Sequence, residues 1–258
     1  MEKLSKSITL VCFGFGLAAK YFVKELLRNK YKIKLITTSR SKSSNNKFLN
    51  INYKNFCFKE GSDYIASEFA LETILKLIDK FKPKKILELG MGIGSVSDTI
   101  LKFKNLNDLN FEYFGTESNE FCLEQLKKNV DFYDEIVLFS ELNEIDRSNK
   151  FDFIIIDGLD DSLKSIVDFC DKNAILFVEG DRKTQTKVLL ELFPKNKYVN
   201  IITLEKNPPY AHEGRSVNSY KGGGQLIFTN PTNMMKLFWF LEKIKTFIKI
   251  RIRKYNRK

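Results

Sequence analysis

Residues 86–94 read Ile86-Leu87-Glu88-Leu89-Gly90-Met91-Gly92-Ile93-Gly94, and this stretch decides the fold. An apolar run followed by alternating glycines is typical of a buried strand that turns tightly into a helix. The glycines let the backbone approach a ligand closely, and the helix that follows offers free N–H groups. The stretch therefore predicts a ligand site at the carboxyl end of a strand.

Strands and helices alternate on both sides of this turn. Strand patterns occur at 85–89, 112–116, 135–139, 151–156, 174–178, 198–204 and 225–229. Helical patterns lie near 63–80, 94–104, 119–130, 161–171 and 183–193. Near-continuous apolar strands separated by amphipathic helices predict a doubly wound, seven-stranded, mostly parallel α/β sheet covered on both faces. The last two strands lack a helix between them, so we expect an antiparallel final hairpin.

Two more strands of this pattern end in a carboxylate. Glu117 closes the strand that begins near Glu112, and Asp157 follows the apolar run 151–156. Carboxyl ends of parallel strands meet at one edge of the sheet, where open α/β sheets bind their ligands. A carboxylate in the place of Glu117 can accept hydrogen bonds from both hydroxyls of a ribose.

In these three features, residues 61–230 resemble the class I (Rossmann-like) S-adenosylmethionine-dependent methyltransferases. Glu88–Gly94 matches the first motif of the family, Glu117 its ribose-binding acid and Asp157-Gly158 its fourth-strand motif. The resemblance implies methyl transfer from S-adenosylmethionine, with the methionine part near Glu88, the ribose near Glu117 and the adenine near 140–142. The cofactor-binding residues that it implies are Glu88, Gly90, Met91, Gly92, Gly94, Glu117, Ser118, Glu141 and Asp157.

A dinucleotide site is the alternative for this glycine turn, because the two kinds of glycine motif are closely related. A carboxylate in the place of Glu88 would repel a pyrophosphate. It suits a cofactor that carries an ammonium and a sulfonium. The sequence therefore favours S-adenosylmethionine over NAD or NADP at this turn.

The long loop 207–224 is the candidate acceptor-binding segment, since long loops at the ligand edge often bind substrate. Within it, Tyr210, Arg215 and Tyr220 are candidate substrate contacts, and His212 is the chain's one histidine. The ordinary pKa of histidine suits a general base, so His212 and Asp157 are the catalytic candidates. The acceptor that we expect is a hydroxyl, or an amine, of a small molecule or of a glycan or lipid-linked precursor.

A divalent metal is disfavoured as a cofactor. Metal-dependent O-methyltransferases carry an Asp at the position of Asp157 and an Asp-Asn pair after the fifth strand, where this chain has Glu179-Gly180-Asp181-Arg182. Asp160 and Asp161 can equally cap the next helix. We therefore assign no residue to a metal, although carboxylates at both strand ends could hold Mg²⁺.

The tetrapeptide Asn207-Pro208-Pro209-Tyr210 has the form of a motif found in amino-group methyltransferases of nucleic acid and protein. In that family the motif directly follows the fourth strand. Here Asp157-Gly158 holds that place and the tetrapeptide follows the sixth strand. The position favours coincidence.

The segment 1–60 resembles the first βαβ unit of NADP-binding epimerase-like proteins. A strand at 8–13 leads into Gly14-Phe15-Gly16-Leu17-Ala18-Ala19, a helix near 18–28 and a strand at 33–37. The polar segment 39–52 is predicted to be a loop. Arg40 would suit a 2′-phosphate, so an NADP-dependent oxidoreductase is an alternative function. The segment is too short for a complete dinucleotide-binding domain.

The tail Met234–Lys258 predicts a basic amphipathic helix, with nine of the 43 basic residues and one of the 32 acidic residues. Apolar and aromatic residues alternate with these charges, so we expect contact with an anionic membrane surface rather than nucleic acid. The alternatives are packing on the protein itself or on a second subunit, which leaves a homo-oligomer open. We expect no signal peptide and no membrane span, and hence a cytoplasmic protein at the inner face of the membrane.

The predicted domains are a βαβ extension (1–60), a methyltransferase domain (61–232) and a helical tail (233–258). The four cysteines are widely spaced, which predicts buried thiols rather than disulfides or zinc ligands. Two further functional classes fit the same features. One is a non-catalytic scaffold that binds the cofactor, and the other is an aminopropyl transferase that shares this fold.

Overall fold

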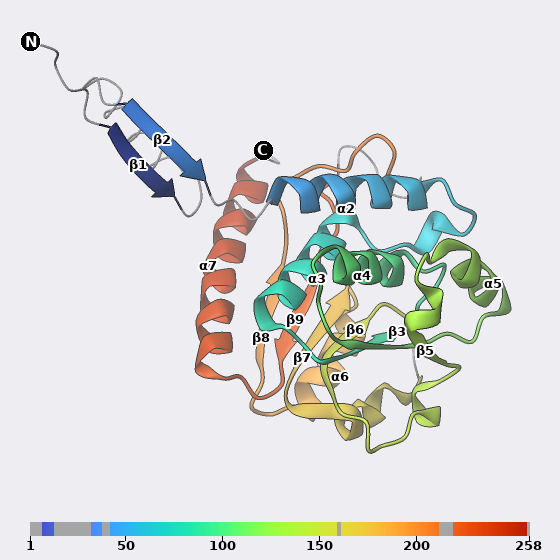
Figure 1. Ribbon diagram of the computed structural model, residues 1–258. Helices are drawn as coiled ribbons and strands as arrows, with labels where there is room; N and C mark the ends of the chain where they lie inside the picture. Colours follow the sequence, from blue (N-terminus) through green and yellow to red (C-terminus); the bar gives the residue numbers. More distant parts are fainter. Residues whose placement is uncertain (1–6, 13–31, 38–41, 159–160, 212–218, 257–258) are drawn as a thin grey trace, which may run out of the picture. The chain divides into compact units, whose positions relative to one another are not determined.

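The computed structural model describes residues 7–12, 32–37, 42–158, 161–211 and 219–256 (Figure 1). The chain forms two compact units, Met1–Lys47 and Phe48–Lys258. The sequence patterns placed a domain boundary near residue 60, whereas the compact units divide between Lys47 and Phe48. The division falls earlier because residues 48–57 pack in the core of the second unit.

Besides residues 42–47, which begin a helix, the described part of the first unit is a pair of parallel strands. Strand β1 (Ser7–Cys12) pairs with β2 (Lys32–Thr37), with Ser7 opposite Lys32 and Cys12 opposite Thr37. Both predicted strands are thereby confirmed. The glycine motif at 14–19, the helix predicted near 18–28 and Arg40 lie outside the described residues, so the NADP site stays a prediction.

The second unit is built on one mixed sheet of seven strands in the order β5-β4-β3-β6-β7-β9-β8. These strands are β3 (Lys85–Leu89), β4 (Glu112–Thr116), β5 (Ile136–Phe139), β6 (Phe151–Ile156), β7 (Cys170–Glu179), β8 (Lys197–Ile201) and β9 (Gly224–Phe228). β9 runs antiparallel to both β7 and β8, and the other pairs are parallel. The predicted mostly parallel sheet with an antiparallel final hairpin is confirmed.

Helices cover both faces of this sheet (Figure 1). The first face packs against α3 (Glu68–Phe81), α4 (Ser95–Leu106) and α5 (Glu120–Asn129), and the second against the 3₁₀ helix η4 (Asp161–Phe169) and α6 (Lys183–Leu192). Successive strand residues alternate between the two cores: Ile86 lies in the first core and Leu87 in the second. Burial on both faces explains why the strands read as continuous apolar runs. Three short 3₁₀ helices also belong to this unit, namely η1 (Ser62–Tyr64), η2 (Tyr133–Glu135) and η3 (Leu142–Glu144).

Residues 42–57 form helix α2 (Lys42–Cys57), so the loop predicted over 39–52 is wrong for most of its length. The Asn, Ser and Lys content suggested a loop, but Leu49, Tyr53 and Phe56 recur at helical spacing and are buried. Helical periodicity outweighs composition here because the three side chains fill one face against the main core.

Two more element boundaries differ from the prediction. The helix expected over 63–80 begins at Glu68, because the hydroxyl of Ser67 accepts a hydrogen bond from the N–H of Ala70 and caps it. The helix expected over 161–171 is the 3₁₀ helix η4, and β7 begins at Cys170. The first change moves the start of a helix, and the second changes the type of a helix and the start of a strand. Neither alters the order of strands in the sheet.

The C-terminal tail forms the predicted helix, α7 (Asn233–Tyr255), and stands beside β8 (Figure 1). β8 is an edge strand, and its outward carbonyl groups pair with no strand that the structure describes. The indole of Trp239 donates to the carbonyl of Tyr198 at 2.7 Å, and the hydroxyl of Thr246 donates to that of Asn200 at 2.6 Å. Helix α7 therefore closes the sheet edge. Among the described residues, no helix is long and apolar enough to cross a membrane.

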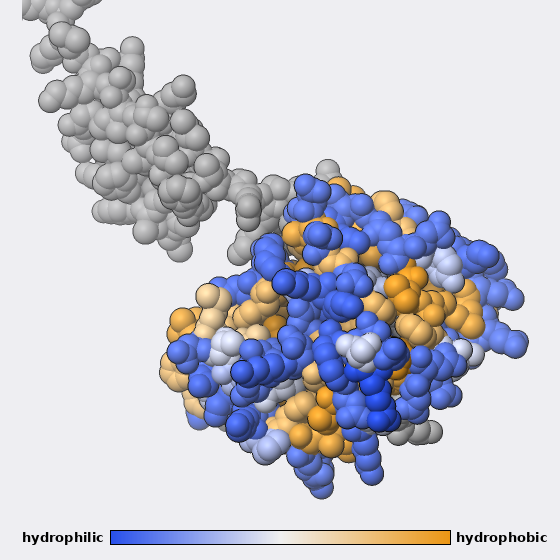
Figure 2. All heavy atoms as spheres, turned by 60° about the horizontal axis from the view of Figure 1, so that its bottom comes forward, coloured by the Kyte–Doolittle hydropathy of each residue, from blue (hydrophilic) through white to orange (hydrophobic). Residues whose placement is uncertain are grey.

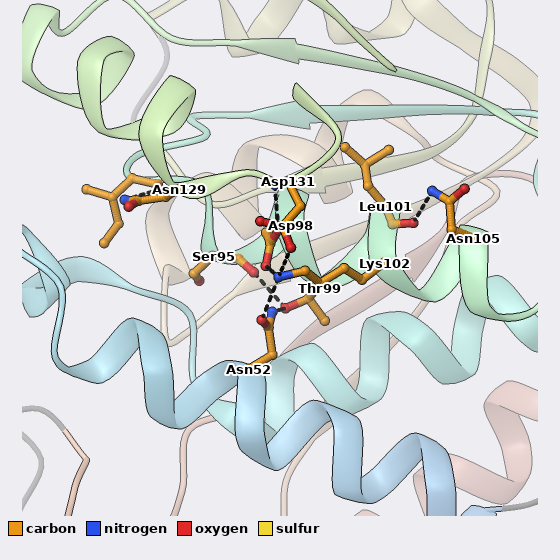
Figure 3. A network of polar contacts seen from close by, with 10 residues as sticks. Asn52, Ser95, Asp98, Thr99, Leu101, Lys102, Asn105, Asn129 and Asp131 are labelled. Carbon is orange, nitrogen blue, oxygen red and sulfur yellow. Dashed lines mark hydrogen bonds and ion pairs between the residues drawn. The ribbon is translucent and has the colours of Figure 1, made fainter. Parts of the chain in front are cut away.

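A polar network, buried at Asn52 and Asp98 and exposed at Asp131, joins α2, α4 and the segment after α5 (Figure 3). The ammonium of Lys102 lies 2.7 Å from the carboxylate of Asp98 and 2.9 Å from that of Asp131, and it donates to the amide oxygen of Asn52. Burial alone would lower the pKa of Lys102, but the two carboxylates outweigh it and raise the pKa. The side chain of Asp98 is fully buried, and Lys102 is its ion-pair partner.

We expect Lys102→Met to lower the free energy of unfolding by about 3 kcal/mol, because it leaves the Asp98 charge buried without its partner. Lys128→Met is the matched control, because it breaks a solvent-exposed pair with Glu124. That control should cost less than about 1 kcal/mol. Urea unfolding of both variants measures the difference. Equal midpoints would show that the network stabilises nothing beyond a surface pair.

Candidate active site

The glycine turn after β3 adopts a backbone that only glycine accommodates easily. Gly90, Gly92 and Gly94 have φ angles of 81°, 54° and 91°. A Cβ on Gly90 would lie 2.5 Å from the Cα of Gly158, so the turns after β3 and β6 touch through backbone. No atom of the described residues lies within 4 Å of the Cβ position of Gly92, so the top of the turn opens to free space. Backbone can therefore approach a ligand here.

Glu117 holds this turn from the neighbouring strand. Its Oε2 accepts a hydrogen bond from the N–H of Gly92 at 2.7 Å, and Oε1 accepts from the N–H groups of Ser118 and Asn119 at 3.0 and 2.9 Å. The carboxylate thus joins the turn after β3 to the loop after β4. A carboxylate has about four acceptor positions, so three N–H donors leave room for a ligand hydroxyl.

Glu88 lies fully buried beneath the turn, on the face of the sheet that α4 covers. Its Oε2 accepts from the hydroxyl of Ser97 at 2.7 Å and from that of Tyr113. Burial raises the pKa of Glu88 to about 8, although both hydroxyls lower it. Its Oε1 is buried and has no hydrogen-bond partner among the described residues. Without a ligand this carboxyl is therefore mostly protonated at neutral pH, and a cationic group near Oε1, such as the ammonium or sulfonium of S-adenosylmethionine, would lower its pKa and favour the carboxylate, whereas a phosphate would not.

Asp157 lies at the end of β6 beside the glycine turn, where its N–H donates to the carbonyl of Leu89 at 3.0 Å. Its carboxylate forms an ion pair with Arg182, whose Nη2 lies 3.4 Å from Oδ1 and also donates to the Asp157 carbonyl. Arg182 further donates to the carbonyl of Glu179 at the end of β7. One guanidinium therefore orients the ends of β6 and β7.

The remaining predicted cofactor residues occupy different places. Met91 is buried, and a Cβ on Gly115 would collide with its sulfur, so its side chain packs on β4 and only its backbone lies in the turn. Ser118 and Glu141 are exposed after β4 and β5. The carboxylate that fixes the chain after β5 is that of Glu144, which accepts from the N–H of Ser140 at 2.8 Å.

The structure divides the candidate substrate residues into two groups, while His212 and Arg215 lie outside the described residues. Tyr210 packs against α2, and its hydroxyl accepts from the amide of Asn50 at 2.6 Å. Tyr220 instead stacks under Arg253 of α7, with the guanidinium carbon 4.1 Å from the ring centroid. Asn207 of the tetrapeptide is buried and donates to the hydroxyl of Ser219 at 2.8 Å, where it closes the base of the loop.

A hollow of about 480 Å³ lies at the carboxyl end of β7 and β8. Gly180, Asn200, Gly222, Tyr220, Lys221 and Arg253 are among its lining residues. Gly180, which lines the hollow, lies two residues before Arg182, and Arg182 contacts Asp157 beside the glycine turn. The hollow is therefore at the same edge of the sheet as the glycine turn.

The carboxylates that would hold a metal already have protein partners. Asp157 pairs with Arg182, and the buried Glu179 accepts from the N–H of Ser67 at 3.2 Å. No group of three or more His, Cys, Asp or Glu side chains is arranged to hold a metal among the residues that the structure describes. Cys57, Cys122 and Cys170 are half-buried and form no disulfide within the described residues.

Several residues that hold the carboxylates of this site in place were not predicted from the sequence. Ser97 and Tyr113 reach Glu88 because α4 returns over β3 and because Tyr113 lies on β4 diagonally opposite Glu88. The buried Glu68 at the start of α3 accepts from Lys221 at 2.5 Å and from Asn50 at 2.8 Å. Only the contact of Ser97 with Glu88 could have been predicted from spacing, because Ser97 lies in the first turn of the helix that follows the strand of Glu88. The contacts of Tyr113 with Glu88, and of Lys221 and Asn50 with Glu68, join segments that are distant in the chain.

No protein-family model and no curated protein matches this sequence. Solved structures do resemble it. One is the SAH-bound methyltransferase from Podospora anserina, which is 13% identical with a TM-score of 0.50; the alignment covers 86% of this chain and 99% of that chain. Another is the precorrin-6y C5,15-methyltransferase from Geobacter metallireducens, which is 15% identical with a TM-score of 0.51 and coverages of 67% and 94%. The strand order and these alignments together show that the chain has the Rossmann-like α/β fold of class I methyltransferases.

Proposed function

We propose that the second unit binds S-adenosylmethionine at the glycine turn and is a methyltransferase. The observation that supports this most is the contact of Glu117 with Gly92, because the carboxylate that we propose for ribose binding lies directly against an open glycine turn. The buried Oε1 of Glu88, which has no hydrogen-bond partner in the described part of the chain, adds an acceptor suited to a cation. Ligands of open α/β sheets bind at this edge.

In this proposal, different residues bind the cofactor and accept the proton of the acceptor. Gly90, Gly92 and Gly94 let the backbone approach the cofactor, and Glu117 accepts from its ribose. When bound, S-adenosylmethionine supplies an electrophilic methyl group. Asp157, fixed by Arg182, lies where an acceptor hydroxyl or amine would approach and could receive its proton; His212 is the second candidate. Positioning of the two reactants would then provide most of the rate acceleration.

The proposed acceptor is a hydroxyl, or an amine, of a small molecule or a glycan or lipid-linked precursor. The hollow beside β7 and β8 supports an acceptor of modest size. Arg253 and Lys254 line it, whereas Lys221 is already paired with Glu68 and Glu205, so the two α7 cations would favour an acceptor that carries a phosphate or carboxylate. The tetrapeptide at Asn207 follows β8 and closes a loop, which supports no role in amine binding.

Calorimetric titration with S-adenosylmethionine, SAH, NADP and NAD tests the proposal. We expect Glu117→Ala to weaken S-adenosylmethionine at least about thirtyfold, because charge-assisted hydrogen bonds to the ribose and the anchor of the turn are both lost. The control is Glu124→Ala, which removes an exposed carboxylate from α5. Circular dichroism checks that both variants fold.

Either of two results would refute the proposal. One is tight binding of NADP without binding of S-adenosylmethionine, abolished by Gly16→Asp, which would move the active site to the N-terminal unit. The other is an unchanged affinity of Glu117→Ala for S-adenosylmethionine. Binding without methyl transfer to any acceptor would instead identify a scaffold, and preference for the decarboxylated cofactor would identify an aminopropyl transferase.

A further inference from the structure

Helix α7 has two faces of different chemistry. The face toward β8 is held by side-chain hydrogen bonds from Trp239, Thr246, Lys249 and Arg253 to carbonyl groups at the sheet edge. The helix therefore does not need its opposite face in order to stay attached to the protein. That opposite face is directed to solvent.

The outer face of α7 carries large apolar side chains. In Figure 2, orange and tan side chains lie among blue ones along the edge of the molecule where α7 stands in Figure 1. Phe240 and Phe247 are 54% and 59% exposed. At helical spacing the outer face consists of Leu237, Phe240, Leu241, Ile244, Phe247 and Ile248, all of them exposed. So large an apolar surface on one helix marks an interaction site.

Basic side chains flank the outer face, chiefly on one side. Lys236, Lys243 and Lys254 project on one side, Lys245 lies on the other, and Arg251 stacks over Phe247 with its guanidinium carbon 4.8 Å from the ring centroid. The one acid of α7, Glu242, is paired with Lys245 at 2.6 Å. An apolar stripe bordered by cations matches the interface of an anionic membrane, with acyl chains below and phosphates beside them.

We propose that α7 docks the protein on an anionic lipid surface through its outer face. The aromatic and aliphatic side chains would enter the boundary between headgroups and acyl chains, while the flanking lysines contact lipid phosphates. The β8 side of the helix remains attached to the sheet. This is attachment in the plane of the membrane, without a span.

Charge disfavours the other occupants of this surface. A second copy docked helix to helix would bring two strongly basic helices together. Nucleic acid would satisfy the lysines but would leave the phenylalanines and leucines unexplained.

The docked helix would lead directly to the candidate acceptor site, an extension that rests on the proposed function. The C-terminal turns of α7 supply Ile250, Arg253 and Lys254 to the lining of the hollow at the sheet edge. A substrate with a lipid tail and an anionic head could therefore keep its tail in the membrane while its head enters this hollow. The class of acceptor that fits is an anionic, lipid-linked molecule.

Co-sedimentation of the full chain with vesicles of phosphatidylglycerol and phosphatidylcholine tests the docking. We expect binding to the mixed vesicles and little to pure phosphatidylcholine. Phe240→Ser combined with Phe247→Ser should lower the partition coefficient at least about tenfold. The control is Leu106→Ser combined with Val137→Ser, which removes exposed apolar side chains from α4 and β5.

A second pair of variants tests the charges. Lys236→Gln combined with Lys243→Gln should weaken binding about fivefold per lysine at about 0.1 M salt, with the difference lost at about 1 M salt. Lys127→Gln combined with Lys128→Gln on α5 removes the same charge elsewhere and should change binding much less. Equal effects of the two lysine pairs would indicate attraction by net charge alone and would overturn docking through α7.

Other results would overturn the proposal as plainly. One is failure of the full chain to bind anionic vesicles, and another is unchanged binding by the double Phe variant. A dimer in sedimentation velocity that the same variant dissociates would make the outer face a contact between subunits. Titration with S-adenosylmethionine separates this test from that of the function, since the α7 variants should keep the affinity of the native chain.

Discussion

Gly90→Ala should lower the free energy of unfolding by about 3 kcal/mol, because two costs combine at this position. Gly90 has a φ angle of 81°, in the left-handed region. A residue with a Cβ loses about 1–2 kcal/mol in that region. The new Cβ would also lie 2.5 Å from the Cα of Gly158 and 2.7 Å from its N. Such crowding costs about 1–3 kcal/mol, and urea unfolding monitored by circular dichroism measures the total loss.

Gly180→Ala provides the matched control, because it shares the first cost and lacks the second. Gly180 has a φ angle of 73°, and no atom within the described ranges lies within 4 Å of its Cβ position. It should therefore cost about 1–2 kcal/mol. If the two variants lose the same stability, the close approach of the turns after β3 and β6 does not constrain the site.

Glu88→Gln should change how stability depends on pH. Burial raises the pKa of Glu88 in the folded protein to about 8, from 4.5 for an exposed glutamate. Between these values the folded state binds more protons than the unfolded state, so Glu88 lowers stability as pH rises through this interval. The accumulated effect is on the order of 5 kcal/mol. The glutamine variant lacks this ionisation, so its stability relative to the native chain should increase across the same interval.

Urea midpoints measured from pH 5 to pH 9 would reveal this difference between the two proteins. Glu124→Gln on the exposed surface of α5 controls for the removal of one carboxylate and should give a profile parallel to that of the native chain. A parallel profile for Glu88→Gln as well would mean that Glu88 ionises normally. The desolvation of this carboxylate would then not affect stability.

The order of the motifs could be predicted from the sequence because each depends on a few adjacent residues. Three glycines after Glu88, and acids at Glu117 and Asp157, define strand ends without reference to the rest of the chain. Parallel pairing then brings these ends to one edge. The structure confirms that edge through the contacts of Gly92 with Glu117 and of Gly90 with Gly158.

Composition misled the prediction where tertiary burial decides. Residues 42–57 are rich in Asn, Ser and Lys, yet they form a helix because Leu49, Tyr53 and Phe56 fill the main core. Composition averages over both faces of a segment, whereas one buried face is enough to stabilise a helix.

By itself, the sequence determined a mostly parallel sheet, a glycine turn with acids at the same edge, and a basic C-terminal helix. Periodicity and glycine placement are local properties, so they can be read along the chain. Only the tertiary structure decided that Glu88 is buried beneath the turn, that Arg182 fixes Asp157, and that α7 turns its apolar residues outward. Each of these depends on contacts between residues far apart in the chain, which no local pattern encodes.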